Sequence, residues 1–69
     1  MTVDITDDQV RQVFEQNQGR MLTADDVLKS LGREDVDGYK RVLHLLSILV
    51  RRRFIFPKYR EGKHGYVRL

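Results

Sequence analysis

The sequence predicts an α+β fold of three helices and a small antiparallel sheet, and three observations support this prediction. Two threonine-led stretches, "ITDDQV" and "LTADDV", carry the chemistry of helix starts. A longer segment at about residues 37–53 repeats its apolar residues at helical spacing. The C-terminal residues 54–69 are rich in aromatic and β-branched side chains, which is typical of paired strands.

The first helix is expected over about residues 7–17. Thr6 suits the N-cap position, and Gln9, at the third helical position, completes a capping box with it. One face of this helix carries Val10, Val13 and Phe14. Gly19 is well placed to end the segment, because glycine is the preferred residue just beyond a helix. A short strand near residues 20–22 is expected to follow.

The second helix, at about residues 24–31, begins with the same chemistry. Thr23 is the expected N-cap and Asp26 closes the box. The aspartates in the first turn of both helices lie where the helix dipole favours negative charge, so we interpret them as caps rather than catalytic carboxylates. Gly32 is expected to end this helix. The turn "REDVDG" leads to the next helix, with Asp35 or Asp37 as its cap.

The third helix, at about residues 37–53, is predicted to be strongly amphipathic. Its expected buried arc consists of Tyr39, Val42, Leu43, Leu45, Leu46, Leu49 and Val50. The opposite side carries Lys40, His44, Ser47 and Arg51, flanked by Arg41 and Arg52. Ile48 falls outside the apolar arc, and we interpret it as either a dimer contact or a packing site that the wheel misplaces.

The apolar run 42–50 within this helix does not indicate a membrane anchor. It contains nine residues and is interrupted by His44 and Ser47, whereas a membrane-spanning helix needs about 20 apolar residues. The same face is needed to bury the two preceding helices, which argues against a helix that lies on a membrane surface. We therefore expect no membrane partner.

The hairpin is expected over residues 54–69, with "FIFPKY" and "GYVRL" as strands and the five residues "REGKH" as the loop. Pro57 lacks a backbone donor, which places its strand at an edge of the sheet. The loop tip would then carry Arg60, Lys63 and His64. The expected register pairs Tyr59 with Gly65, Pro57 with Val67 and Ile55 with Leu69.

The charge of the chain is divided unevenly between its two halves. Residues 1–35 contain eight acidic and four basic residues, a net charge of −4, whereas residues 36–69 contain two acidic and nine basic residues, a net charge of +7. Scattered surface charge explains such segregation poorly. The division predicts an anionic partner for the second half.

Several classes of function are disfavoured by the composition. At 69 residues we expect one domain, 1–69, that buries only about 60% of its unfolded surface. The chain has no cysteine, and His44 and His64 lack a matching carboxylate motif, so we expect no metal site and no other cofactor. No glycine-rich phosphate loop and no nucleophile with a base is recognisable, so we expect no enzyme and no catalytic residues.

The amino terminus bears on the location of the protein. The stretch "MTVDITDDQ" has acidic residues where a secretory signal needs positive charge and an apolar run. This composition predicts a cytoplasmic location, and the prediction is also compatible with association with the nucleoid.

The order of these elements resembles the winged helix-turn-helix superfamily. Three stretches carry the resemblance: "GRMLTADDVLKSLG" as short strand and second helix, "YKRVLHLLSILVRRRFI" as the recognition-type helix, and "FIFPKYREGKHGYVRL" as the wing. One departure is the turn "REDVDG", which is longer and more acidic than the tight turn usual before a recognition helix. The acidic groups of Glu34, Asp35 and Asp37 would repel phosphate there.

The resemblance implies a mode of DNA binding that the charge division also favours. The third helix would enter the major groove, where Lys40, Arg41 and His44 would read base edges. Arg51 and Arg52 would reach phosphate at its far end, and the basic wing would clamp the backbone. We expect Tyr39 to pack in the core. The complete set of expected DNA-binding residues is Lys40, Arg41, His44, Ser47, Arg51, Arg52, Lys58, Arg60 and Lys63.

Two functions remain open from the sequence. The first is a small double-stranded-DNA-binding protein, either a transcriptional regulator or a DNA accessory factor, acting as a homodimer because one such module contacts few base pairs. The alternative is a winged-helix interaction module that binds a protein or RNA in a larger assembly. Ile48 and the acidic turn would then form part of the contact surface.

Overall fold

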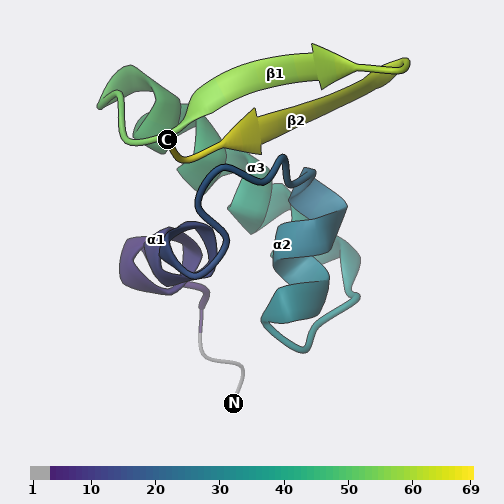
Figure 1. Cartoon of the computed structure of the whole chain (residues 1–69). Helices are drawn as coiled ribbons and strands as arrows, with labels where there is room; N and C mark the ends of the chain where they lie inside the picture. Colours follow the sequence, from purple (N-terminus) through teal and green to yellow (C-terminus); the bar gives the residue numbers. More distant parts are fainter. Residues whose placement is uncertain (1–3) are drawn as a thin grey trace.

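The computed structural model describes residues 4–69. Its elements are, in order, α1 (Asp7–Glu15), α2 (Ala24–Ser30), α3 (Val36–Arg51), β1 (Phe56–Arg60) and β2 (Lys63–Val67). Figure 1 shows the antiparallel hairpin lying across one side of the three helices, with its β1–β2 turn extending beyond them. Three helices followed by an antiparallel hairpin confirm the predicted α+β class.

Both predicted capping boxes are present at the helix starts. The Thr6 hydroxyl accepts from the Gln9 N–H at 3.3 Å, and the Gln9 side chain accepts from the Thr6 N–H at 2.9 Å. Thr23 and Asp26 repeat this exchange at 3.1 and 3.0 Å. The first-turn aspartates therefore lie at helix N-termini, where the dipole stabilises their charge.

The first helix ends two residues before its expected boundary. The Asn17 side-chain amide donates to the Val13 carbonyl at 2.7 Å, which occupies an acceptor of the last turn. Gly19 then adopts a positive φ of 80°. Its N–H donates to the Arg68 carbonyl at 2.7 Å and so ties the end of this segment to the C-terminal strand.

The third helix begins at Val36, with Asp35 as its N-cap, and ends at Arg51 rather than at residue 53. Its end is a Schellman motif: the Arg53 N–H donates to the Val50 carbonyl and the Phe54 N–H to the Leu49 carbonyl, both at 3.0 Å. Arg53 occupies the left-handed position of this motif with a φ of 60°. The left-handed residue turns the chain out of the helix before the expected boundary.

Replacing Arg53 with glycine should stabilise the protein by about 0.5–1 kcal/mol. A side chain in the left-handed region costs about 1–2 kcal/mol, which is partly offset by the larger unfolded-state entropy of glycine. The end of α2 offers the control, because Gly32 already occupies the same position there with a φ of 74°. Urea unfolding should give a higher free energy of unfolding for Arg53→Gly than for the parent, and a lower one for Gly32→Ala. A free energy of unfolding for Arg53→Gly below that of the parent would contradict this account.

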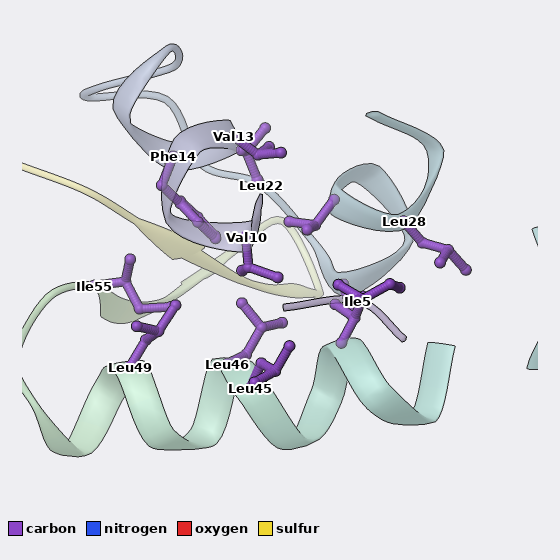
Figure 2. Packing of buried hydrophobic residues seen from close by; sticks show 13 residues of the cluster. Ile5, Val10, Val13, Phe14, Leu22, Leu28, Leu45, Leu46, Leu49 and Ile55 are labelled. Carbon is purple, nitrogen blue, oxygen red and sulfur yellow. The ribbon is translucent and has the colours of Figure 1, made fainter. Parts of the chain in front are cut away.

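The hydrophobic core lies between the three helices and the base of the hairpin. Figure 2 shows Leu45, Leu46 and Leu49 on the side of α3 that faces Val10 and Phe14 of α1. The other buried members of the cluster are Ile5, Val13, Leu22, Ala24, Val27, Leu28, Val42 and Ile55. No helix within residues 4–69 is both long and apolar enough to cross a membrane.

The buried arc of α3 is displaced from the predicted one. Tyr39 and Leu43, expected in the core, are each 39% exposed, whereas Ile48 is partly buried and packs against the core. On the same flank as Ile48, Arg41 contacts Ile5, just before α1, and Arg52 contacts Asp7 of α1, so this flank faces the first helix. Ile48 is therefore a packing residue, and the opposite flank of the helix is left uncovered.

The hairpin register differs by one residue from the expected register. The structure pairs Pro57 with Tyr66, Lys58 with Gly65, and Tyr59 with His64. Its loop is the two residues Glu61 and Gly62, with φ values of 52° and 78°, rather than the five residues "REGKH". Two consecutive positive φ values match the short turn that the twist of a hairpin favours. This one-residue difference changes which side chains share a face.

The short strand expected near residues 20–22 contributes a single bridge. Leu22 pairs with Tyr66 through two backbone hydrogen bonds of 2.8 Å. The bridge places the linker between α1 and α2 beside β2. Pro57 therefore lies on the strand away from this linker, in agreement with its expected place at a sheet edge.

Candidate nucleic-acid interface

The outer side of α3 carries a polar ridge, which consists of Lys40, His44, Ser47 and Arg51 and is called the α3 ridge below. All four side chains are exposed and lie opposite the buried leucines. None of them forms a hydrogen bond or ion pair with a side chain of residues 4–69. Their donors are therefore available to a partner along the length of the helix.

Two arginines expected beside this ridge turn toward α1 instead. The Arg41 Nε donates to the Ile5 carbonyl at 3.0 Å. One terminal nitrogen of Arg52 lies 3.6 Å from an Asp7 carboxylate oxygen. Both residues are still exposed, but their guanidinium groups have partners in the first helix or just before it. The structure thus separates Arg41 and Arg52 from the α3 ridge.

The acidic turn before α3 is partly neutralised by its own arginine. Arg33 donates to both carboxylate oxygens of Asp35, at 2.9 and 2.7 Å, and the Gly38 N–H donates to Asp35 at 2.8 Å. The Arg33 hydrogen bond, followed by the one from Gly38, lowers the pKa of Asp35 to about 2. Asp35 is therefore a charged, paired cap, and it repels phosphate less than the sequence alone suggests.

An exposed apolar stripe lies beside the α3 ridge and was not predicted from the sequence. It consists of Val36, Tyr39 and Leu43, which are 68%, 39% and 39% exposed and are spaced to share one helix face. The sequence pattern placed Tyr39 and Leu43 inside the apolar arc. Val36 gave no signal either, because it precedes the expected start of the helix. This set is called the α3 stripe below.

The hairpin presents a basic face toward its tip. One face carries the side chains of Lys58, Arg60 and Lys63. Lys58 and Arg60 are two residues apart on β1 and so point to the same side, and Lys63 lies opposite Arg60 on β2. All three are exposed and form no ion pair with residues 4–69. They are called the wing cations below. The structure therefore brings these three predicted residues together.

The other face of the hairpin is aromatic. Tyr59 lies opposite His64, and Tyr66 follows two residues later on β2. The ring centroids of Tyr59 and His64 are 6.5 Å apart, and those of His64 and Tyr66 are 5.2 Å apart. His64 was expected in the loop, so these three rings were not expected to lie on one face. They are called the wing rings below.

Most ion pairs lie in the first half of the chain, so the unpaired basic residues lie mainly in the second half. In the first half, Arg11 pairs with Asp7 and Asp8, Lys29 with Asp25, and Arg33 with Asp35. In the second half, the one ion pair found within residues 4–69 joins Arg52 to Asp7. Unpaired positive charge is thus concentrated on α3 and the hairpin.

Arg68, near the C-terminus, differs from the unpaired basic residues because its guanidinium is bonded within the protein. Its guanidinium donates to the Phe54 carbonyl at 3.0 Å and lies 4.2 Å from the centre of the Phe54 ring. This contact holds the two ends of the hairpin segment together. Arg68 therefore has a structural role.

Histidine and carboxylate side chains do not gather into a metal-like cluster in the part of the chain that the structure describes. No group of three His, Cys, Asp or Glu residues within 4–69 is arranged to hold a metal ion. His44 lies on α3 and His64 on β2. The two histidines belong to separate surfaces.

Comparison with known proteins identifies the architecture. Neither a protein-family model nor a curated protein sequence matches the chain. Its structure is similar to that of the ferric uptake regulator from Francisella tularensis, which was determined with iron, with a TM-score of 0.73 and 24% sequence identity. The similarity covers 99% of this chain and 53% of that one, so this chain spans about half the length of the regulator. The chain has a winged-helix fold, in which three helices are followed by the β1–β2 hairpin as the wing.

Proposed function

We propose that this protein binds double-stranded DNA and acts as a regulator or accessory factor, with α3 in the major groove and the wing on the phosphate backbone. The observation that carries the proposal is the gathering of unpaired cations on the α3 ridge and the wing, while three of the four bases of the acidic half are paired with aspartates. A surface of this kind releases counterions from DNA when it binds. The similar structure belongs to a protein named as a regulator, which supports a regulatory role.

The α3 ridge supplies the donors that base readout requires. Lys40, near the start of the helix, would donate to guanine acceptors in the major groove, and His44 and Ser47 would follow along the groove floor. Arg51, at the far end, would reach a phosphate and help to fix the register. Arg41 is already bonded to the Ile5 carbonyl, so we assign it the role of positioning α1 against α3 rather than reading a base.

The α3 stripe gives the same helix an apolar edge. The one apolar group that base pairs present in the major groove is the thymine methyl, and apolar side chains contact it there. Val36, Tyr39 and Leu43 lie beside the α3 ridge on the exposed side of the helix. The proposed reading surface would therefore combine donors for guanine with an apolar contact for thymine.

Selection from a pool of random duplexes tests this proposal, and thymine-to-uracil replacement tests the apolar contact. A recovered duplex in which uracil replaces thymine should bind a few-fold more weakly, because the replacement removes the methyl group and leaves the hydrogen-bonding groups in place. Leu43→Ala should reduce the difference between the two duplexes. Failure to recover any duplex would reject the proposed function, whereas equal binding of both duplexes would reject the methyl contact alone.

A protein-interaction module is the second candidate, and the α3 stripe is the observation that favours it. Exposed apolar side chains that line one helix face also suit a protein groove. Under this alternative, Leu43→Glu would abolish co-purification of a protein partner, and no duplex would be retained at any salt concentration. The random-duplex selection therefore discriminates between the two candidates. The homodimer expected for a DNA-binding module would be detected by sedimentation of the free chain.

A further inference from the structure

We propose that the wing rings bind unpaired nucleotides by base stacking, which is an activity separate from duplex binding. The three rings come from both strands of the hairpin and share one face. Tyr59 and His64 are directly opposite each other, and Tyr66 lies next to His64 on the same strand. His64 and Tyr66, two residues apart on β2, and Tyr59 on β1 therefore form a compact aromatic surface on one face of the hairpin.

The exposure of the rings changes along the hairpin. Tyr66 is half-buried and packs against the core, so it anchors one end of the surface. His64 is exposed, and Tyr59, nearer the turn, is 71% exposed. The wing rings therefore extend from the body of the protein into solvent, where a flexible strand can reach them.

Stabilisation of the hairpin does not account for all of this aromatic surface. Cross-strand aromatic pairs do stabilise hairpins. However, the Tyr59 and His64 centroids are 6.5 Å apart, near the outer limit for interacting rings, and the ring planes are inclined by 32°. The contact between them covers little of the Tyr59 ring, which leaves its face available to another flat group.

The neighbouring charges indicate what that group belongs to. Arg60 and Lys63, both unpaired within residues 4–69, are the chain neighbours of Tyr59 and His64 at the turn and project from the other face of the hairpin. Rings on one face of a narrow hairpin, with free cations at the same turn on the other face, suit a polyanion whose flat groups stack on the rings while its backbone passes around the turn. This is the chemistry of single-stranded nucleic acid. A duplex does not offer this chemistry, because its base faces are covered by stacking within the helix. An apolar protein segment would leave the adjacent cations without partners.

Titration of the full chain with oligothymidylate of 12 nucleotides tests the proposal, with oligouridylate of the same length to distinguish DNA from RNA. Tyr59→Leu should weaken binding roughly 5- to 150-fold, the range for loss of one stacked base. Tyr59→Phe keeps the ring and should retain the affinity. Phe56→Leu on the opposite face of the hairpin is the matched control, since it removes another exposed ring from the same strand and should change the affinity less than twofold.

Ring signals in nuclear magnetic resonance spectra of the unmodified protein give a second readout that needs no variant. Addition of either oligonucleotide should shift the Tyr59 and His64 ring signals upfield and leave those of Tyr39 in place. The proposal is overturned if neither oligonucleotide binds, if Tyr59→Leu binds as tightly as the parent, or if only Tyr39 shifts. Affinity of Tyr59→Leu for a blunt duplex should stay within twofold of the parent, which separates this result from a failure of the proposed function.

Discussion

Replacing Lys58, Arg60 and Lys63 together with glutamine should weaken duplex binding about a hundredfold at physiological salt. Each phosphate contact contributes about fivefold at 0.15 M salt, because the logarithm of affinity falls by about 0.9 per contact for each tenfold rise in salt. The wing cations are exposed and form no ion pair within residues 4–69, so no internal partner has to be lost when they meet phosphate. Glutamine keeps much of each stem and removes only the charge.

The same triple variant should also show a shallower salt dependence. The slope of log affinity against log salt should decrease by about 3, one step for each lost contact. Fluorescence anisotropy with a labelled duplex at four or five salt concentrations measures both the affinity and the slope. Loss of affinity with no change in slope would indicate that the variant had altered the fold of the wing and not its phosphate contacts.

The acidic half of the chain provides a control with the same change in net charge. Replacing Arg11, Lys29 and Arg33 with glutamine also removes three positive charges, but each of these residues is paired with an aspartate. This variant should bind duplex DNA within about threefold of the parent, since its cations are outside the proposed surface. Equal losses in the two triple variants would mean that net charge, rather than the position of the wing, governs binding.

The features that could be predicted from the sequence are those decided by neighbouring residues. The capping box of Thr6 and Gln9 needs only residues three apart, so its chemistry is written locally and the structure contains it. The division of charge also needed no tertiary information. The structure added that three of the four bases of the acidic half are paired with aspartates, which a residue count cannot reveal.

The features that escaped prediction depend on contacts between distant segments or on a backbone conformation that the residue type disfavours. A helical wheel gives the spacing of apolar residues but not which flank of α3 the rest of the protein covers, and in the structure Ile48 packs against the core while Leu43 is exposed. The hairpin register depends on Glu61 and Gly62 both adopting positive φ values, which glutamate rarely does. A shift of one residue brought Tyr59 opposite His64 and so created the aromatic face.

Substitution of Gly65 should produce the largest loss of stability among the glycines. A Cβ atom at this position would lie 2.8 Å from the Met21 Cγ and 3.0 Å from the Leu22 carbonyl oxygen. The backbone of Leu22 cannot move away freely, because two hydrogen bonds of 2.8 Å hold it to Tyr66. We expect Gly65→Ala to lower the free energy of unfolding by about 1–3 kcal/mol and Gly65→Val by more.

Gly38 offers a matched comparison because a Cβ there would also meet close neighbours. Its three nearest atoms would belong to the side chains of Asp35, Leu28 and Arg33, at 2.8, 3.0 and 3.2 Å. Side chains can rotate away, and alanine is favoured over glycine within a helix by about 0.5–1 kcal/mol. Crowding and helix propensity act in opposite directions here, so Gly38→Ala should change the free energy of unfolding by less than about 1 kcal/mol.

Urea unfolding of Gly65→Ala and Gly38→Ala would separate close backbone approach from side-chain crowding. A domain of this size has a total stability of roughly 3–10 kcal/mol, so the loss expected for Gly65→Ala is a substantial share of the whole. The variant should also bind duplex DNA more weakly than Gly38→Ala, because the Leu22 bridge joins the helices to the strand that carries Lys63. If Gly65→Ala were as stable as the parent, the bridge could not be what fixes the wing against the helices, and the geometry linking α3 to the wing would need another origin.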